Sequence, residues 1–597
     1  MDDQNKNMLL AFALSLLVLV TWMWFFPPPE PPVRTAETEQ TDSVALPPEA
    51  TSGGAVTADQ VAETAAPRVT IETPSLRGTI SLDGGRLDDL SLTTYRETLD
   101  EDSDIVHLFS PVGGARTPFY AIYGWRPRGA LEFENVPGPN TRWEQVGDNT
   151  LTVDTPVVLE WDNGAGLVFT QTYEVDAKYM FHITQSVTNN GDARVEMDPY
   201  GIVARHGVPA DLSNFFILHE GMIQMADGTL TEDDYSVMEE YRRVDREAAP
   251  AQITEAAQDG WIGFTDKYWM ATLIGMPGDA VTAVSKFVPG ANIYQTEIRQ
   301  PVVAIEPGAT VEADSMLFAG AKEWSTIRGY ENNLGIESFL NAIDWGWFFF
   351  LTKPIFAVLY WINGYIGNMG WSIVALTLLI KSVLLPLAWK SYVSMAKMKE
   401  LQPEMAAIKE RAGDDKQKLQ KEMIDLYKTK KVNPAAGCLP ILMQIPIFFS
   451  LYKVIFVTIE LRHAPWIGWV RDLSAPDPSS LYNLFGLLPW DAPEPTSFLA
   501  LIFIGLMPIV LGTSMWLQMK LNPAPADKTQ AMIFGWMPWV FMFVLGGFAS
   551  GLVLYWITNN IITFSQQYLI MRLNGHKPDL FGNMTSGMRR KKGDATK

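Results

Sequence analysis

The chain has 597 residues, which is too long for one ordinary domain, and its 20 Trp and 30 Phe indicate contact with lipid. The formal net charge of −21 hides a division, because residues 27–343 carry a net −29 and residues 344–597 carry a net +9. This division argues against a nucleic-acid-binding protein and favours a chain that occupies two compartments. The single cysteine, Cys438, excludes an intramolecular disulfide, so any exported domain must be held together by its core alone.

The first 26 residues predict a transmembrane anchor. Residues 8–26 form an uncharged apolar run that is long enough to span a bilayer. A cleaved signal peptide would have a basic start and small residues after the apolar run, whereas this run follows Asp2 and Asp3 and ends in aromatic residues and PPPEPP. We therefore expect an uncleaved anchor over residues 1–26, followed by a flexible Pro-rich linker over residues 27–67.

Residues 68–343 predict a large all-β sandwich domain. Short runs of β-branched and aromatic residues alternate with turn signals, most clearly at Leu167–Val175 and Tyr179–Val187. A helical interruption is expected near Thr231–Ala249. Four of the six histidines lie in this domain: His107, His182, His206 and His219. They lack the paired spacing of metal ligands, so we expect a domain without metal, cofactor or hydrolytic activity.

The residues that follow the β domain are aromatic and then strongly apolar. Residues 344–367, interrupted by Lys353 and Pro354, favour a helix that lies in the membrane interface, and a further span is the alternative. Residues 368–388 predict a transmembrane helix that contains Lys381. A charge inside a span is costly and usually faces a protein interior or a watery cavity. The alternative is that Lys381 snorkels, since the span ends roughly 9 Å further along the helix.

Residues 389–433 predict a cytoplasmic αα-hairpin. Basic residues outnumber acidic ones, and Gly413, Asp414 and Asp415 divide the segment into two helical halves. Four methionines form either an adaptable surface for varied partners or the internal packing of the hairpin: Met395, Met398, Met405 and Met423.

Residues 434–573 predict four further transmembrane helices: Gly437–Ile459, Ser497–Leu517, Ala531–Gly547 and Leu552–Leu573. The acidic segment 462–496 is expected outside the cell membrane, and the basic segment 520–530 and the basic tail 574–597 are expected in the cytoplasm. The sequence thus predicts a polytopic α-helical membrane protein with six transmembrane helices. Both termini are expected in the cytoplasm, with the all-β domain on the opposite side.

The last five predicted spans are poor in charge, and we treat Lys381 as the only charged residue well inside them. None of the last five spans contains Asp or Glu, so the acidic relays of proton pumps and ion transporters are missing. No GxxxxGK[ST] phosphate loop is present either. Several polar residues are expected near Lys381: Thr377, Gln444, Asn559, Thr563, Gln566 and Gln567. They predict a hydrated groove that opens to the cytoplasm, and polar contacts between helices are the alternative.

Four segments resemble the YidC-type membrane protein insertases of the Gram-negative inner membrane. They are KSYVSMAKMKELQPEM at Lys390–Met405, GDDKQKLQKEMIDLYK at Gly413–Lys428, KVNPAAGCLPILMQIPIF at Lys431–Phe448 and SGLVLYWITNNIITFSQQ at Ser550–Gln567. The resemblance implies an N-terminal anchor, a periplasmic β-supersandwich and a five-helix insertase core. It also implies a substrate groove with one positive residue, where arginine is common and Lys381 stands here. Thr377 and Trp556 match groove-lining positions, the second of which is usually tyrosine.

The resemblance further implies the function. The chain is expected to be a membrane protein insertase and chaperone, not an enzyme, with the groove residues Lys381, Thr377, Gln444, Trp556, Asn559 and Thr563 and with no catalytic residue, cofactor or metal. Its expected partners are nascent inner-membrane proteins, the lipid bilayer, the Sec translocon, and the ribosome or signal recognition machinery through the hairpin and basic tail, without direct DNA binding. The alternative is a membrane-anchored envelope glycan-binding protein or enzyme that acts through its β sandwich. Deleting residues 68–321 separates the two, because insertion would survive and a β-sandwich activity would not.

Overall fold

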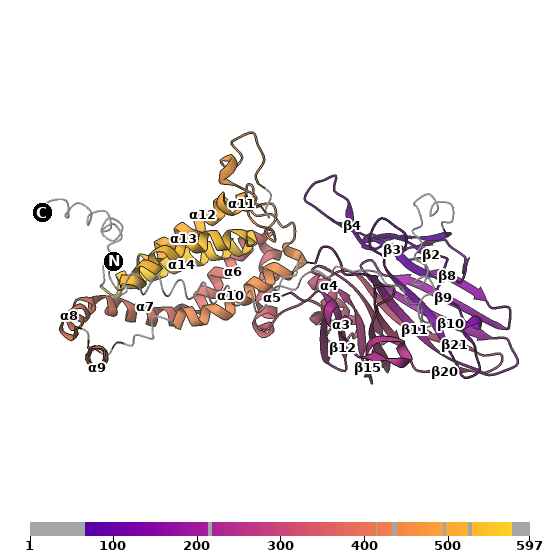
Figure 1. Ribbon diagram of the computed structural model, residues 1–597. Helices are drawn as coiled ribbons and strands as arrows, with labels where there is room; N and C mark the ends of the chain where they lie inside the picture. The colour runs from indigo at the N-terminus through magenta and orange to yellow at the C-terminus, as the bar shows by residue number, and fades with distance from the viewer. Residues whose placement is uncertain are drawn as a thin grey trace. The chain divides into compact units, whose positions relative to one another are not determined.

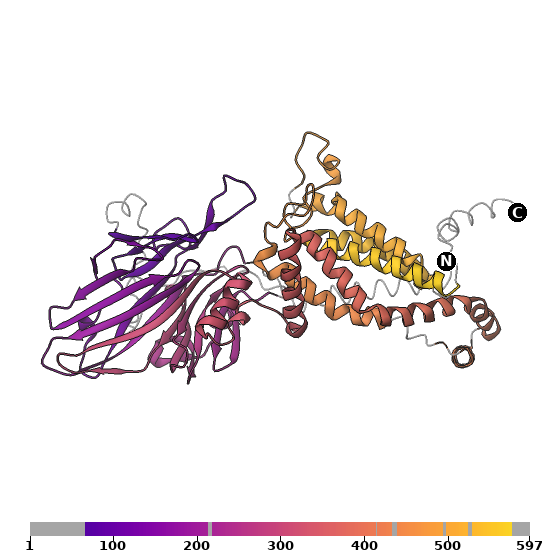
Figure 2. The same cartoon turned by 180° about the vertical axis from the view of Figure 1, so that it is seen from behind.

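The computed structural model describes residues 66–212, 218–413, 415–430, 432, 439–493, 497–522 and 528–575. The predicted anchor 1–26, nearly all of the predicted linker 27–67, Cys438 and the basic tail beyond Gly575 lie outside the described residues. The described chain consists of a β domain, from β1 to β21, followed by a helical region (Figures 1 and 2).

The β domain is built from two sheets whose strands are almost all antiparallel. The first sheet contains, in spatial order, β14 (Arg243–Val244), β15 (Ala249–Ala256), β18 (Val281–Val288), β19 (Ile293–Arg299), β11 (Val195–His206), β5 (Phe119–Arg128), β3 (Arg86–Arg96), β2 (Leu76–Ser81), β1 (Arg68–Glu72) and β7 (Thr150–Leu151), with β20 (Val303–Ile305) on β11 and β4 (Ile105–Phe109) on β3. The second contains β13 (Thr229–Asp234), β12 (Gly221–Ala226), β16 (Gly260–Thr265), β17 (Trp269–Gly275), β21 (Thr310–Ala321), β10 (Met180–Asn189), β9 (Leu167–Val175), β8 (Val157–Asp162) and β6 (Glu144–Val146). The all-β prediction for this domain is confirmed.

Alternation along the strands places the core between the sheets. In β9, every second residue is buried (Leu167, Phe169, Gln171, Tyr173 and Val175) and the residues between them are more exposed, which is the pattern of a strand with one covered face. The predicted helical interruption near Thr231–Ala249 is confirmed only in part. That stretch holds the short α3 (Tyr235–Glu239) and a 3₁₀ turn over Asp245–Glu247, and residues on either side of them pair in strands β13, β14 and β15.

Helices dominate the chain after β21. Their bounds are α4 (Trp324–Leu334), α5 (Phe349–Ile366), α6 (Met369–Val383), α7 (Leu385–Glu400), α8 (Gln402–Ala412), α9 (Lys416–Thr429), α10 (Leu439–Val457), α11 (Phe498–Ile502), α12 (Leu506–Met519), α13 (Lys528–Val544) and α14 (Ser550–Leu573). Helices α12, α13 and α14 run side by side, and α14 also packs against α6 and α7 (Figures 1 and 2).

The predicted helix over residues 368–388 is not one straight helix. Helix α6 ends at Val383 and α7 begins at Leu385, with an angle of 67° between them. Pro386 lies at the second position of α7, where it lacks the N–H that would bond to Ser382 and clashes with the preceding turn. The prediction missed this break, although the proline is visible in the sequence.

The predicted hairpin over residues 389–433 contains three helices instead of two. Helix α7 continues past residue 389 to Glu400, and only α8 and α9 form an antiparallel pair. All four methionines of this segment are half-buried, and the Met405 sulfur accepts a hydrogen bond from the Tyr427 hydroxyl at 4.0 Å. Met405 therefore contributes to packing within the hairpin.

The predicted span over Ser497–Leu517 is also broken. Helix α11 ends at Ile502 and a new helix, α12, begins at Leu506. The Asp477 carboxylate accepts a hydrogen bond from the backbone N–H of Met507 at 2.8 Å and so caps α12 from a distant loop. A side chain at Gly505 would come within 2.5 Å of that carboxylate, so the cap requires glycine there.

The described helices differ in how well their length suits a bilayer. Helix α5 is long and apolar enough to cross one, and α6 with α7 satisfies the same requirement only as a bent pair. The apolar stretches of α10, α12 and α13 are shorter than 18 residues: Leu442–Val457, Leu506–Met519 and Met532–Gly547. The count of six transmembrane helices therefore stays a prediction, as does the interfacial placement of α5.

A second lysine lies among the apolar helices, so the treatment of Lys381 as the only charged residue well inside the predicted spans is wrong. Lys453 is on α10 with a buried side chain, and its Nζ lies 2.6 Å from the carboxylate of Asp344. That carboxylate also accepts hydrogen bonds from the backbone N–H groups of His219 and Gly346. Lys453 therefore belongs to the contact between the helical region and the β domain, and the prediction overlooked it although it lies inside the predicted span Gly437–Ile459.

Glu460 lies beyond the end of α10, in a contact with the start of α4. Its Oε1 accepts a hydrogen bond from the backbone N–H of Trp324 at 2.8 Å, and its Oε2 is buried without a partner among the described residues. Burial raises the pKa of Glu460 to about 7, with a smaller contribution from the carboxylate of Glu323.

We expect this contact to be more stable in weak acid than above neutrality. The unfolded glutamate ionises near its ordinary value of 4.5, whereas the folded one keeps its proton until about pH 7. The protonated Glu460 therefore contributes its full stabilisation to the contact below pH 4.5. This contribution, roughly 1–3 kcal/mol, is lost as the pH rises towards 7. Hydrogen exchange in α4, corrected for intrinsic rates, should be slower at about pH 5 than at about pH 8. Glu460→Gln should remove this difference, and an undiminished difference in that variant would contradict the assignment.

Candidate functional site

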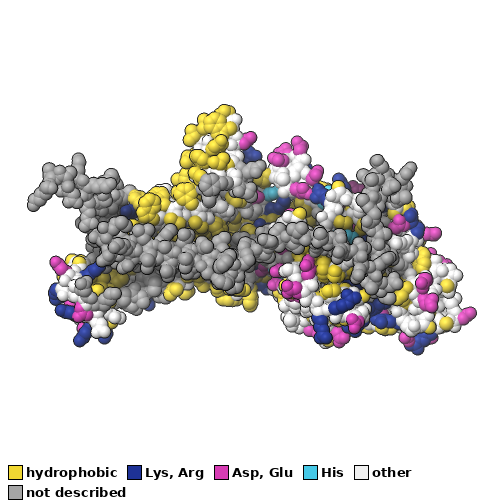
Figure 3. All heavy atoms as spheres, in the orientation of Figure 1, with side chains coloured by type: hydrophobic (Ala, Val, Ile, Leu, Met, Phe, Trp, Pro, Cys, Tyr) yellow, Lys and Arg dark blue, Asp and Glu magenta, His cyan; other side chains and the backbone are white. Residues whose placement is uncertain are grey.

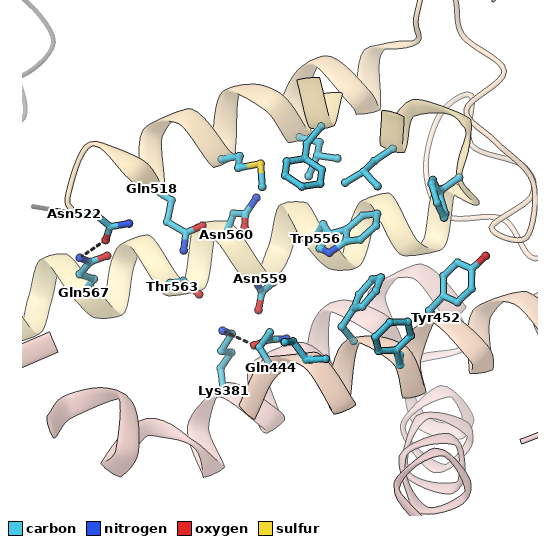
Figure 4. Close-up of a pocket in the computed structure, with 18 of the residues that line it drawn as sticks. Lys381, Gln444, Tyr452, Gln518, Asn522, Trp556, Asn559, Asn560, Thr563 and Gln567 are labelled. Atoms are coloured by element: carbon cyan, nitrogen blue, oxygen red, sulfur yellow. Dashed lines mark hydrogen bonds between the residues drawn. The ribbon is translucent and has the colours of Figure 1, made fainter. Parts of the chain in front are cut away.

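A cavity of about 680 Å³ lies among the apolar helices. It is bounded by α6, α7, α10, α12, α13 and α14, and its residues come from segments up to about 190 positions apart in the chain (Figure 4). Its main polar residues are Lys381, Gln444, Gln518, Asn522, Asn559, Asn560, Thr563 and Gln567, and its aromatic residues are Tyr392, Phe448, Phe449, Tyr452, Phe541, Phe548 and Trp556. Of the described residues that line this pocket, Lys381 is the only charged one.

Lys381 projects into the pocket from the last turn of α6. Its Nζ donates a hydrogen bond to the Oε1 of Gln444 on α10 at 3.1 Å. Gln444 in turn donates from its Nε2 to the hydroxyl of Tyr555 on α14. The amide of Gln444 therefore orients the lysine and is itself oriented, while the other two protons of the ammonium group remain available to water or to a guest.

Amide side chains cluster at the same end of the pocket as Lys381. Figure 4 shows the side-chain oxygen of Asn559 directed towards Lys381 and Gln444, and this oxygen is buried without a partner among the described residues. Gln567 donates to Asn522 at 3.0 Å, a contact that ties α14 to the end of α12. These groups can hydrogen-bond to either donors or acceptors, so they suit polypeptide of varied sequence rather than one fixed ligand.

The opposite end of the pocket is aromatic. The rings of Phe448 and Trp556 stack with centroids 5.0 Å apart and an interplanar angle of 17°. Phe548 meets the edge of Trp556 at 6.0 Å. The directions of α10, α12 and α14 place this aromatic end away from the hairpin and the amide-rich end towards it. The pocket therefore changes from polar and charged to apolar along its length (Figure 4).

Five of the six residues predicted for the groove line this pocket: Lys381, Gln444, Trp556, Asn559 and Thr563. Thr377 does not, because its side chain is buried and its hydroxyl donates to the backbone carbonyl of Ile373 at 2.7 Å. Tyr555, the residue before Trp556, accepts a hydrogen bond from Gln444 through its hydroxyl. This role of Tyr555 was not predicted.

Gln518, Asn522 and Asn560 also line the pocket and were not predicted. Gln518 lies in the last turn of α12, and Asn522 lies three residues beyond the end of that helix. Asn560 donates to the hydroxyl of Ser514 at 3.1 Å and so joins α14 to α12 at the pocket wall.

A β domain joined to apolar helices that enclose a positively charged, amide-lined pocket defines a membrane protein of the insertase class. Two family models match the chain: the YidC periplasmic domain over residues 68–358 and the 60Kd inner membrane protein over residues 361–577. The chain belongs to the YidC family of membrane protein insertases.

The curated relatives cover nearly the whole chain. The membrane protein insertase YidC of Dinoroseobacter shibae is 62% identical over 99% of this chain and 99% of its own length. That of Cereibacter sphaeroides is 61% identical over 99% of this chain and 96% of its own. A crystal structure of an active YidC insertase with its first transmembrane domain resolved is 17% identical, covers 85% of this chain and 95% of its own, and has a TM-score of 0.35.

Proposed function

We propose that this insertase admits the polar outer segment of a nascent membrane protein into the pocket at Lys381. The observation that carries the proposal is one ammonium group, held by Gln444 at 3.1 Å, among amides and opposite an aromatic end. An acidic or polar segment would be drawn to the charged end and would exchange hydrogen bonds with the amides. Its apolar segment would then move into lipid along the outer faces of the helices. No covalent bond changes, so no catalytic residue is needed.

The predicted topology places the pocket's charged end towards the cytoplasm. Six spans would result from the anchor 1–26, the helix over residues 368–388 and four helices within 434–573. Basic residues gather on α7 to α9, on residues 520–530 and on the tail 574–597, which the positive-inside rule assigns to the cytoplasm. Both termini would then be cytoplasmic and the β domain periplasmic, in the bacterial inner membrane to which the family belongs.

The partners beyond substrate and lipid are proposed from charge. Helices α8 and α9 of the hairpin carry the basic residues Lys409, Arg411, Lys418 and Lys428. Together with the tail 574–597, these residues suit the anionic surface of a ribosome or its targeting machinery. The electrostatic attraction is of the order of 1 kcal/mol for each basic residue near such a surface. Cooperation with the Sec translocon belongs to the same proposal.

Photo-crosslinking from the pocket tests the proposed route. A photoreactive residue at Asn559 should crosslink to the polar outer segment of a stalled nascent chain during insertion. The matched control is Ile561 on the same helix, which is 52% exposed and does not line the pocket. A crosslink from Asn559 that is absent at Ile561 supports entry into the pocket. Equal crosslinking at both positions, or none at Asn559 while insertion proceeds, would contradict it.

A further inference from the structure

The segment between α10 and α12 carries an apolar loop, residues 481–490, that takes no part in the pocket. Its sequence, LYNLFGLLPW, contains no charge. Its large exposed side chains are Leu481, Tyr482, Leu484, Phe485, Leu487 and Trp490, and Leu487 is 84% exposed. Figure 3 shows hydrophobic side chains gathered at the top of the view, where Figure 1 draws the loop that precedes α11. Apolar side chains grouped in this way mark an interaction surface.

The root of the apolar loop is fixed to the start of α12. The Ser480 hydroxyl donates to the carbonyl of Phe503 at 2.7 Å, and the backbone N–H of Leu481 donates to the carbonyl of Ile504 at 3.1 Å. Asp477 and Ser479 cap the first residues of α12. The loop is therefore anchored at the outer end of an apolar helix, where the proposed topology places the outer surface of the membrane.

Seven of the nine backbone N–H groups in the apolar loop donate to acceptors within the loop or its root. The N–H groups with acceptors inside the loop or its root belong to Leu481, Tyr482, Leu484, Phe485, Gly486, Leu487 and Leu488. A loop in water does not need this, because solvent accepts the hydrogen bonds that the chain leaves open. A segment that enters hydrocarbon does need it, since an unsatisfied N–H there costs several kcal/mol.

The exposure of the apolar side chains is built into the loop. Leu484 and Phe485 have φ of 47° and 60°, a left-handed conformation that bulky residues adopt only when their surroundings impose it. Side-chain contacts hold the two ends of the loop together: the Trp490 indole donates to the carbonyl of Tyr482 at 3.1 Å, and Asn483 donates to the carbonyl of Trp490 at 3.3 Å. These contacts keep the tip residue Leu487 outward.

We propose that the apolar loop inserts into the outer leaflet, at the boundary between lipid headgroups and acyl chains beside α12. Trp and Tyr prefer this boundary, and the internally bonded backbone suits it. The charges that flank the loop, Asp477 and Asp491, are both acidic, and no Lys or Arg occurs between residues 472 and 519. The insertion is therefore driven by apolar surface rather than by attraction to anionic lipid, and it concerns lipid rather than the nascent chain of the proposed function.

The test places a fluorophore on the full-length chain in vesicles of phosphatidylethanolamine and phosphatidylglycerol. In a Cys438→Ser background, one variant carries the label at the tip of the loop, through Leu487→Cys. A second variant carries it on the β domain through Leu99→Cys, at a residue that is 50% exposed. Lipids with a spin label near the headgroup should quench the label at residue 487 and not the label at residue 99. Raising the salt concentration should leave the quenching unchanged. A second substitution, Leu487→Asp, should abolish quenching of a label at Leu481→Cys.

Three results would overturn the proposal. The first is a label at residue 487 that iodide in the water phase quenches as strongly as the label at residue 99. The second is shielding from iodide without quenching by lipid, which would assign the loop to a second copy or another protein. The third is quenching that salt abolishes. A label at Val540 on α13, 55% exposed, reports separately on the topology. Deep quenching at residue 540 without quenching at residue 487 rejects the loop alone, and failure at both rejects the loop and the spans together.

Discussion

Replacing Lys453 with methionine is expected to destabilise the contact between the helices and the β domain by about 3–5 kcal/mol, because it leaves a buried charge without its partner. The side chain of Lys453 is 6% exposed and that of Asp344 is 15% exposed, and their charged atoms are 2.6 Å apart. Without the ammonium group, the described residues leave Asp344 with the backbone N–H groups of His219 and Gly346 as its hydrogen-bond donors. Methionine fills a similar volume, so the loss comes from charge rather than from a cavity.

An exposed pair in the same chain provides the matched control. Lys430 and Glu404 on the hairpin are 2.7 Å apart, but their side chains are 43% and 47% exposed. Lys430→Met should therefore cost no more than about 1 kcal/mol, because water replaces the lost partner. Hydrogen exchange around Asp344 in detergent-solubilised protein measures the difference locally, without assuming that the whole chain unfolds in one step.

The double variant Lys453→Met with Asp344→Asn separates the ion pair from the packing around it. If the single variants are destabilised by an uncompensated charge, removing both charges should recover much of the loss. Equal exchange rates in Lys453→Met and Lys430→Met would contradict the expected effect. A double variant that is no better than either single variant would show that the aliphatic part of Lys453 matters more than its charge.

The features of the fold that depend on local pattern were predictable from the sequence. Strand β9 lies at the predicted Leu167–Val175 because its side chains alternate between a buried and a half-exposed face. The two broken helices were not predicted, for different reasons. Pro386 is visible in the sequence and its effect is local. The cap that starts α12 comes from Asp477, about thirty residues earlier, and only the folded chain brings it there.

The residues of the pocket also divide into those that the local sequence pattern predicts and those that it does not. Gln444, Asn559 and Thr563 were predicted because an amide or hydroxyl stands out in an apolar helix. Thr377 was wrongly placed, since a threonine inside a helix can satisfy its hydroxyl on the preceding turn, as it does on Ile373. Lys453 is visible in the predicted span Gly437–Ile459 and was overlooked, but its pairing with Asp344 was not predictable, because no helical periodicity reports a pair 109 positions apart.

Reversing the charge of Lys381 is expected to have the largest effect on insertion. In Lys381→Glu the pocket would repel the acidic outer segments that the ammonium group attracts, so insertion of such substrates should fall below the level of Lys381→Ala. Lys381→Arg should be tolerated because it keeps the sign of the charge and can still donate to Gln444. Substrates with neutral outer segments should be affected little by any of the three.

The size of the effect depends on the dielectric of the pocket. Two unit charges at ~4 Å interact by ~1 kcal/mol in bulk water and by ~4 kcal/mol at an effective dielectric of 20. Only the larger value offsets a useful part of the cost of moving an anionic segment into the membrane. The half-buried position of Lys381 in a largely apolar pocket favours the larger value, and the surrounding amides keep the site wet enough for a peptide to exchange hydrogen bonds.

An insertion assay with a series of substrates that differ only in the number of outer acidic residues checks this expectation. The loss caused by Lys381→Ala should grow with each acidic residue, and Lys381→Glu should steepen the trend. Gln444→Leu serves as the control for geometry, because it removes the amide that orients the ammonium group and leaves the charge in place. Its loss should be smaller than that of Lys381→Ala and should follow the same trend. If Lys381→Ala lowers insertion equally for acidic and neutral substrates, attraction by charge is wrong, and the lysine acts through helix packing or hydration of the pocket.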